Sequence, residues 1–245
     1  MATSAPKMPA LAAIIFDMDG VVLDSQAAAN QALVEAASQH GVRLNVSELE
    51  ELVGASEQQF WSYVKDRYHL PEPIEYYARS YSEDREIASY DQTLLSPGLE
   101  ELLVDLRHTD VQVALATSGS RKRMNAVIEM YRLAPWLDVA LCREDAEREK
   151  PAPDLFLAVA AALGVSPEAC LVFEDSARGI AAARAAQMFV VGFGAYCISD
   201  AHLAVADAQI YGFQGVDAAE LEGLWQARSA SGARSLRLGP LSRNR

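Results

Sequence analysis

The hydrophobic and polar positions follow two different rhythms along the chain. Residues Leu11–Phe16 form a short apolar run that ends at Asp17, and a run bounded so tightly predicts a buried strand. From residue 25 to residue 95, apolar side chains recur every three or four positions, as at Ala29 and Leu33. This spacing predicts several helices and no strand.

After residue 97 the pattern alternates between strands and helices. The predicted strands cover residues 111–116, 139–142, 170–173 and 189–192, and the predicted helices cover residues 120–131, 153–163 and 176–186. Repeated units of a strand followed by a helix imply a parallel sheet with helices on both faces. We therefore expect an α/β fold in which residues 8–24 and 96–226 form a Rossmann-like parallel sheet core.

Two segments fall outside this predicted core. The helical block at residues 25–95 is an insertion after the first strand, and we expect it to form a small α-helical domain. Residues 227–245 contain five arginines, no acidic residue and many Ser and Gly residues. This composition predicts a flexible basic tail.

Composition narrows the classes of partner and compartment. The 245 residues are 51% hydrophobic, which is ample for a core, and they carry a net charge of −13. Such a surface repels nucleic acids and anionic membranes, so we expect neither as a partner. No apolar run approaches the roughly 20 residues of a membrane span, and three dispersed cysteines suit a reducing compartment. We expect a cytoplasmic monomer or homodimer.

Acidic residues stand directly after two of the predicted strands. Asp17 and Asp19 follow the first strand, and Glu174 and Asp175 follow a later one. Because ligands in open α/β sheets bind beyond the carboxyl ends of the strands, we expect these carboxylates to converge. Mg²⁺ prefers oxygen ligands and would relieve their mutual repulsion. The alternative for Asp175 alone is that it caps the next helix.

A second set of residues is suited to holding a phosphate group. Thr117 and Ser118 begin a turn between a strand and a helix, where hydroxyls and N–H groups make an anion site, although Ser120 could also simply cap that helix. Lys150 precedes Pro151 on a stiff loop, and its charge would bind phosphate.

These residues together predict phosphoryl transfer. A carboxylate in line with phosphorus, such as Asp17, can act as nucleophile and form an acyl-phosphate. Lys150, the Thr117 hydroxyl and Mg²⁺ would stabilise charge on the transferring group. Asp19 would protonate the leaving oxygen and then deprotonate the water that cleaves the intermediate.

Four short motifs occur in a set order along the chain. They are DMDGVVLDS from Asp17, TS from Thr117, KP from Lys150 and EDS from Glu174. Together they resemble the motifs of the haloacid dehalogenase-like (HAD) superfamily over residues 11–224. The segments KPAPDLF and FEDSARGI are most similar to its β-phosphoglucomutase-like phosphatase branch. The resemblance implies that the helical insertion is a small α-helical cap.

The resemblance also implies a role for each candidate residue. Asp17 would be the nucleophile that forms an aspartyl-phosphate, Asp19 the acid and base, and Thr117 and Lys150 the phosphate-binding residues. The implied Mg²⁺ ligands are Asp17, the backbone carbonyl of Asp19, and Asp175, with Glu174 in or beside the coordination shell. The expected reaction is hydrolysis of a small phosphorylated metabolite, of the sugar phosphate or nucleoside monophosphate type.

The cap selects the substrate in such enzymes. Candidate selecting residues here are Glu57, Gln58, Trp61 and Arg79. Trp61 has an alternative interpretation, because a tryptophan on an amphipathic helix is more often a core residue than a substrate contact.

Other functions of the family fit the sequence less well. Members that dehalogenate lack the second aspartate, which is present here as Asp19. Phosphosugar mutases carry a histidine and an arginine where this cap has Ala29 and Glu57, which weakens the alternative of an intramolecular mutase. Lys65 is the only cap lysine, and its polar setting does not suit the Schiff-base lysine of phosphonate hydrolases. A catalytically silent binding module is the remaining alternative, although every required side chain is present.

Overall fold

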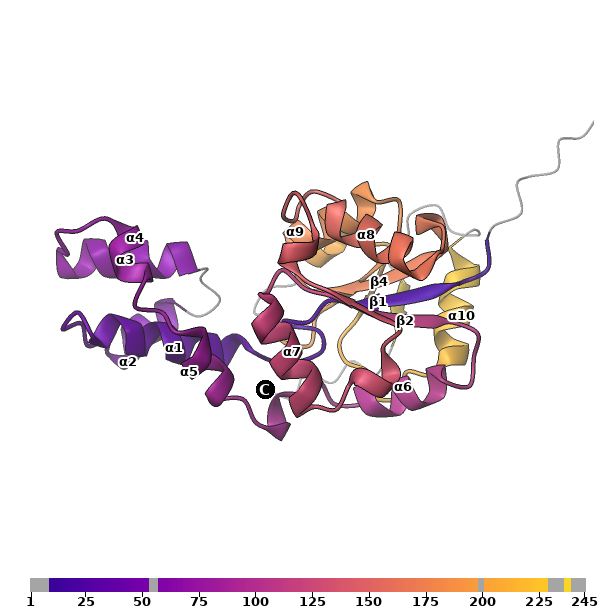
Figure 1. Cartoon of the computed structure of the whole chain (residues 1–245), viewed down its shortest axis with the longest axis horizontal. Coiled ribbons are helices and arrows are strands. Elements are labelled where there is room, and N and C mark those ends of the chain that lie inside the picture. Colours follow the sequence, from indigo (N-terminus) through magenta and orange to yellow (C-terminus); the bar gives the residue numbers. More distant parts are fainter. Residues whose placement is uncertain (1–8, 53–56, 198–200, 229–235, 239–245) are drawn as a thin grey trace, which may run out of the picture. The chain divides into compact units, whose positions relative to one another are not determined.

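The chain forms two compact units. The structure, a computed structural model, describes residues 9–52, 57–197, 201–228 and 236–238. One unit is formed by Met1–Asp24 with Leu95–Arg245, and we call it the core unit; the other, Ser25–Leu94, is the helical unit (Figure 1).

The core unit is built on a parallel sheet. Its strands among the described residues are β1 (Ala13–Phe16), β2 (Gln112–Ala116), β3 (Val139–Leu141), β4 (Cys170–Glu174), β5 (Phe189–Phe193), β6 (Ala208–Ile210) and β7 (Leu236–Leu238). They lie in the order β3-β2-β1-β4-β5-β6-β7, and every neighbouring pair is parallel. The predicted Rossmann-like α/β fold is confirmed, and β1 lies between β2 and β4.

Helices cover both faces of this sheet. The α-helices of the core unit are α6 (Leu99–Leu106), α7 (Arg121–Met130), α8 (Asp154–Leu163), α9 (Ala177–Ala185) and α10 (Ala218–Ala227). Short 3-10 helices occur at η2 (Ala134–Trp136), η3 (Arg143–Asp145), η4 (Pro167–Ala169) and η5 (Ala201–Val205). In Figure 1, α8 and α9 lie over one face and α6 and α7 over the other. Every residue of β1 and β4 is buried, as expected for strands covered on both sides.

Aromatic residues dominate one part of the core. Phe16 of β1 stacks on Phe173 of β4, with ring centroids 5.1 Å apart. Phe213 meets the Phe173 ring edge-on at 5.3 Å and stacks on Phe193 of β5 at 4.6 Å. These phenylalanines tie together three neighbouring strands, two of which end in the predicted site residues.

The helical unit has a core of its own. Its elements are α1 (Gln26–Ser38), α2 (Val46–Glu51), α3 (Glu57–Tyr68), α4 (Ile74–Ala78), α5 (Glu83–Ala88) and η1 (Gln92–Leu94), and none of its described residues lies in a named strand. The apolar faces of α1, α3 and α4 meet in a buried cluster that includes Leu33, Trp61, Val64 and Tyr77. The buried members on α1, Leu33, Ala36 and Ala37, and those on α3, Phe60, Trp61 and Val64, have the three-and-four spacing that an amphipathic helix requires.

The structure differs from the predicted elements at the C-terminal edge of the sheet. β7 lies within the segment predicted as a flexible tail and pairs in parallel with β6. Its three residues, Leu-Arg-Leu, alternate in polarity as a strand does, and they cover an edge that β6 would otherwise expose. The tail residues 229–235 and 239–245 lie outside the described residues.

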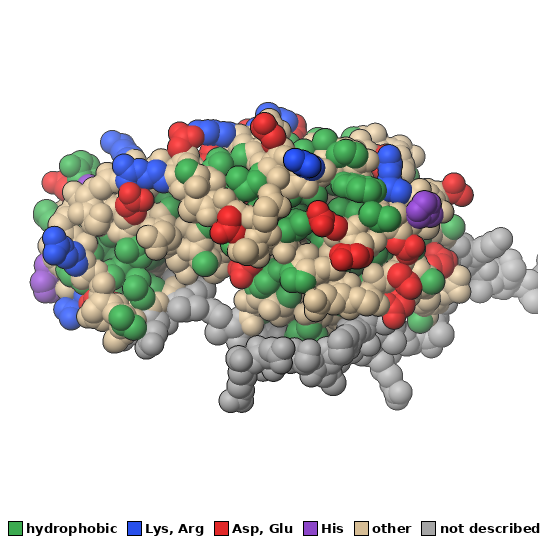
Figure 2. Space-filling view, turned by 90° about the horizontal axis from the view of Figure 1, so that it is seen from below, with side chains coloured by type: hydrophobic (Ala, Val, Ile, Leu, Met, Phe, Trp, Pro, Cys, Tyr) green, Lys and Arg blue, Asp and Glu red, His purple; other side chains and the backbone are tan. Residues whose placement is uncertain are grey.

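The whole chain has a net charge of −13. Acidic side chains are spread over the face that Figure 2 shows. A cavity of about 480 Å³ lies beside α6 and α10, with Leu11 before β1 in its wall, and it contains none of the predicted site residues. None of the helices in the described part of the chain is long and apolar enough to cross a membrane.

The aromatic cluster predicts where the core is most sensitive. We expect Phe173→Ala to lower the free energy of unfolding by about 3–5 kcal/mol, because a fully buried ring with two aromatic neighbours is removed. Leu157→Ala, at a partly exposed position of α8, should cost less than about 1 kcal/mol. Urea denaturation followed by tryptophan fluorescence measures both, and equal losses in the two variants would contradict the prediction.

Candidate active site

The predicted carboxylates and Thr117 follow the carboxyl ends of the adjacent strands β2, β1 and β4. Asp17 follows β1 directly, and its N–H donates to Phe173 O of β4 at 3.0 Å. Thr117 follows β2, and its N–H donates to Leu141 O of β3, also at 3.0 Å. Because these bonds continue the sheet ladder past the last paired residues, the backbone of each site residue is held by its neighbouring strand.

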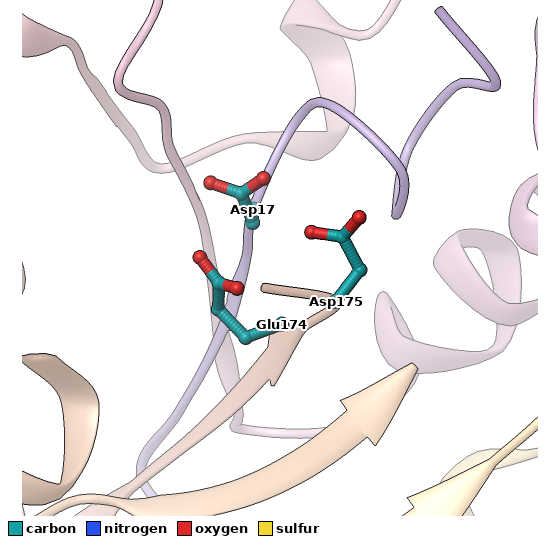
Figure 3. A group of neighbouring side chains, drawn as sticks. All are labelled: Asp17, Glu174 and Asp175. Carbon is teal, nitrogen blue, oxygen red and sulfur yellow. The ribbon is translucent and has the colours of Figure 1, made fainter. Parts of the chain in front are cut away.

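Three of the four predicted carboxylates lie together. Asp17, Glu174 and Asp175 each offer an oxygen, and these atoms all lie within 4.8 Å of one another (Figure 3). Asp17 and Glu174 are almost completely buried, with 6% and 1% of their surface exposed. The donors are all carboxylate oxygens, which is the chemistry that suits a hard divalent cation. The Asp19 carboxylate is not in this group and forms an ion pair with Arg123.

Lys150 reaches into the same group. Its Nζ donates to Asp17 Oδ1 at 2.6 Å and to Glu174 Oε1 at 2.8 Å. The ammonium also lies 4.7 Å from the centroid of the Phe156 ring. The main-chain oxygen of Lys150 accepts hydrogen bonds from the guanidinium of Arg178, so both ends of the lysine are held. One buried ammonium thus faces three carboxylates, and a divalent cation would complete the charge balance.

The pKa values of the site reflect this shortage of positive charge. Burial raises the pKa of the Asp17 carboxyl to about 7, against the opposing charge of Lys150. Burial also raises the pKa of Asp175, helped by the negative charges of Glu174 and Asp17, to about 9. Burial alone would lower the pKa of the Lys150 ammonium, but Asp17 and Glu174 together outweigh it and raise that pKa.

Two glycines leave the space that the carboxylates occupy. A β-carbon at Gly179 would lie 1.6 Å from Glu174 Oε1. A β-carbon at Gly20 would lie 2.0 Å from Asp175 Oδ2, and Gly20 also has a φ of +74°, which side chains rarely adopt. The acidic group therefore sits in a cradle that any larger residue at either position would fill.

Helix capping is carried out by residues other than Asp175. The N-cap of α9 is Ser176, whose hydroxyl accepts from the Gly179 N–H at 3.0 Å. Glu174 Oε2 in turn accepts from the Ser176 N–H at 2.8 Å. The alternative that Asp175 is itself the cap is therefore wrong, and its carboxylate is directed to the acidic group instead (Figure 3).

The phosphate-binding candidates lie in the turn after β2. Thr117 is buried, and its Oγ1 accepts from the Gly119 N–H at 2.9 Å, while Ser118 is exposed. Ser120 caps α7, since its Oγ accepts from the Arg123 N–H at 3.1 Å. Capping by Ser120 and an anion site at Thr117 are thus compatible in one turn.

The candidate substrate-selecting residues are in two different environments. Glu57, Gln58 and Arg79 are exposed in the helical unit. Trp61 is completely buried there, stacked 6.0 Å from Tyr77 and edge-on to Phe60 at 5.3 Å. That surrounding is typical of a core residue.

The cap lysine has a structural role. The Lys65 Nζ donates to the main-chain oxygens of Leu70 and Glu72 at 2.7 and 2.6 Å, so it closes the end of α3. This engagement further weakens the phosphonate hydrolase interpretation.

Sequence reasoning missed several contacts to the predicted site residues, among them the Arg178 bonds to the main-chain oxygen of Lys150. Arg123 pairs with Asp19 from a position 104 residues away. His202 Nε2 lies 2.6 Å from Asp175 O and donates to it, from a position 27 residues away. Neither residue belongs to a local motif, so only the three-dimensional arrangement reveals them.

Fold and site together define a Rossmann-like α/β protein with a buried, lysine-bridged acidic group at the carboxyl edge of its sheet. The chain belongs to the haloacid dehalogenase-like hydrolases, whose family model matches residues 11–187. Several curated relatives are phosphatases by name, and the chain is accordingly a phosphate-monoester hydrolase.

Particular relatives cover most of the chain. It is 33% identical to a probable pseudouridine-5'-phosphatase of Drosophila melanogaster, over 72% of this chain and 79% of that protein. It is 26% identical to a phosphorylated carbohydrates phosphatase of Thermotoga maritima, over 71% and 81%. A match of 31% identity to the chloroplastic protein SUPPRESSOR OF QUENCHING 1 of Arabidopsis thaliana covers 73% of this chain but only 17% of that protein.

Solved structures share the fold. The β-phosphoglucomutase of Clostridium difficile superposes with a TM-score of 0.71 at 22% identity, covering 90% of this chain and all of that one. The CbbY protein of Rhodobacter sphaeroides, solved with xylulose-(1,5)-bisphosphate, gives a TM-score of 0.69 at 23% identity, over 86% and 99%. At these identities the likeness concerns the fold alone.

The glycine cradle predicts that Gly→Ala is destabilising at Gly179, whereas the same substitution at a helical glycine outside the cradle is stabilising. Gly179→Ala should lower the free energy of unfolding by about 1–3 kcal/mol, because Glu174 must move away from Lys150 to make room. Gly223→Ala, on an exposed face of α10 with open space around it, should raise stability by about 0.4–1 kcal/mol. Chemical denaturation compares the two, and a neutral or stabilising Gly179→Ala would contradict the cradle.

The raised pKa values predict how stability without divalent cations depends on pH. The folded protein holds Asp17 and Asp175 protonated more tightly than the unfolded chain does, so their contribution to stability is complete below about pH 4. It is lost as the pH rises through about 7 and then about 9. The melting temperature in a chelator should therefore fall across this window.

The variant Asp175→Asn should lose the upper part of that fall, because the carboxyl that titrates near pH 9 is absent. Calorimetric melting at a series of pH values tests both statements. A melting temperature that stays level or rises from pH 7 to pH 9 in the original protein would contradict them.

Proposed function

We propose that the protein hydrolyses a small phosphorylated metabolite, of the sugar phosphate or nucleoside monophosphate type, through an aspartyl-phosphate at Asp17 and with Mg²⁺. The observation that carries the proposal is the position of Asp17. Its buried carboxylate stands at the end of β1, in hydrogen-bond contact with Lys150 and within reach of Glu174 and Asp175. A nucleophile needs such a setting, in which neighbouring charges can also stabilise the group being transferred.

The residues that would hold Mg²⁺ are Asp17 and Asp175, with Glu174 in or beside the shell and the Asp19 backbone carbonyl as a further oxygen ligand. The fit rests on the oxygen-only donor set, on its burial and on the cradle left by Gly20 and Gly179. When bound, Mg²⁺ supplies positive charge that neutralises the carboxylates and phosphoryl oxygens. Binding requires deprotonated carboxylates, so it should tighten as the pH rises.

The chain's own residues account for the two chemical steps. In the first, an Asp17 oxygen forms a bond to phosphorus while the bond to the leaving oxygen breaks, and Asp19 gives that oxygen a proton. In the second, Asp19 takes a proton from water, whose oxygen displaces Asp17 and releases inorganic phosphate. Lys150 and the Thr117 hydroxyl, with the adjoining turn at Ser118, would bind the phosphoryl oxygens in both steps.

The names of the relatives support the substrate class. They include phosphatases of pseudouridine 5'-phosphate, of phosphorylated carbohydrates and of fructose 1-phosphate. Within the helical unit, exposed Glu57, Gln58 and Arg79 offer polar groups that could select such a substrate, whereas buried Trp61 would act by supporting the unit's core. The cytoplasm suits this substrate class and stays our prediction, as does a monomeric or homodimeric state.

Replacing the nucleophile is the direct test. We expect Asp17→Asn to lower Mg²⁺-dependent hydrolysis of 4-nitrophenyl phosphate by more than about 10³-fold, because an amide cannot form the aspartyl-phosphate. Asp110→Asn, at an exposed turn before β2, is the matched control and should keep full activity. Release of nitrophenolate is followed with Mg²⁺ and with a chelator, and undiminished turnover by Asp17→Asn would remove Asp17 from the mechanism.

The same assay extends to the substrate class. A panel of sugar phosphates and nucleoside monophosphates is scored for release of inorganic phosphate, and a sugar 1-phosphate is also examined for conversion to an isomer. Phosphate release without isomer supports the hydrolase, and isomer formation would favour the mutase instead.

A further inference from the structure

Arg123 occupies a position from which its side chain is directed to the site. It lies in the first turn of α7, where the Ser120 cap holds its N–H at 3.1 Å. Helical side chains lean toward the N-terminus of their helix. The N-terminus of α7 follows β2 through the turn that contains Thr117, so the Arg123 guanidinium is brought back to the carboxyl edge of the sheet.

The composition of this first turn is electrostatically unusual. It holds Arg121, Lys122 and Arg123 and no acidic residue, although the positive end of a helix dipole disfavours cations. Each arginine is balanced by a carboxylate from elsewhere in the core unit. Arg121 pairs with Asp145 at 2.6 Å, and Arg123 pairs with Asp19. The side chain of Arg123 is only 14% exposed, so its ion pair is much less screened by solvent than that of Arg121, which is 48% exposed.

The guanidinium of Arg123 lies next to the phosphate-binding turn. A β-carbon at Gly119 would be 3.7 Å from Arg123 Nη1 and 3.1 Å from Thr117 Oγ1. Arg123 therefore approaches the turn at Gly119, where no side chain stands between the guanidinium and the backbone. From this place beside the turn it forms its ion pair with the Asp19 carboxylate.

We propose that Arg123 is a positioning residue: its guanidinium keeps the Asp19 carboxylate out of the Asp17–Glu174–Asp175 group and in place to protonate the leaving oxygen. Asp19 is only two residues from Asp17, and a cation bound by the acidic group would attract a carboxylate so close to it. The Arg123 pair opposes that movement, so Asp19 stays available as the acid and base. This inference rests on the proposed function.

The test is the dependence of rate on the leaving group. The value of kcat/KM is measured with Mg²⁺ for phenyl phosphates whose phenols differ in acidity, from 4-nitrophenol to unsubstituted phenol. General acid catalysis matters most for the least acidic phenol and contributes roughly 10²–10⁴-fold where it is fully used. We expect Arg123→Met to lower kcat/KM for phenyl phosphate by about 10²-fold and for 4-nitrophenyl phosphate by less than about fivefold.

Three comparisons distinguish positioning from a general structural effect. Arg123→Lys keeps the positive charge but lacks the planar guanidinium with its paired donors. Its kcat/KM for phenyl phosphate should therefore lie between that of Arg123→Met and that of the original protein. Asp19→Asn should show the same steep dependence on the leaving group, and adding Arg123→Met to it should change that dependence little. Arg121→Met, in the same turn, should behave as the original protein. Melting temperatures report whether each variant is folded.

The outcomes separate this inference from the proposed function. A steeper dependence in folded Arg123→Met, matched by Asp19→Asn, supports the positioning role. An equal loss for all the phenyl phosphates, or no loss, overturns it while leaving the proposed function intact. If the original protein with Mg²⁺ hydrolyses none of these esters, the proposed function fails, and this inference fails with it.

Discussion

The close packing of three carboxylates, two of them buried, beside a single lysine is the constraint on which the rest of the site depends. Charges removed from water are costly unless partners compensate them. Lys150 forms direct ion pairs with two of these carboxylates, those of Asp17 and Glu174. The arrangement in turn requires β1 and β4 to be neighbours, Arg178 to hold the Lys150 backbone, and position 179 to lack a side chain.

The same constraint explains how an acidic protein can accept an anionic substrate. The net charge of −13 describes the whole surface, whereas the site is organised by local pairs. Arg123 neutralises Asp19, and Lys150 offsets part of the buried group, which leaves a charge that a divalent cation would balance. Local charge at close range outweighs distant surface charge, because solvent and salt screen the distant charges.

Much of the fold and the centre of the site could be predicted from the sequence, for an identifiable reason. Short, tightly bounded apolar runs such as LAAIIF and CLVF indicate buried parallel strands, and the residues after such strands meet at one edge. This reasoning found Asp17, Glu174 and Asp175 without any coordinates. The short strands β6 and β7 each have a polar residue in the middle of their sequence, so they form no continuous apolar run and were missed, whereas the equally short β3 is apolar throughout and was found.

Side-chain contacts between segments that lie far apart in the sequence could not be predicted from it. Arg123 and His202 stand in no motif, and their partners Asp19 and Asp175 are identified only when the chain is folded. The helical period placed Trp61 on an amphipathic face, but period alone does not distinguish a core position from a substrate contact. The structure supplies that distinction through burial, since Trp61 is enclosed by other aromatic rings.

The order in which the paired residues are synthesised adds a consequence for biogenesis. Asp17 precedes its partner Lys150 by 133 positions, and Glu174 comes later still. A nascent chain therefore carries its future nucleophile as an ordinary hydrated carboxylate until Lys150 and Glu174 have also been synthesised, and the pairing of β1 with β4 cannot form before then. Competence for chemistry thus depends on joining segments that leave the ribosome well apart in time.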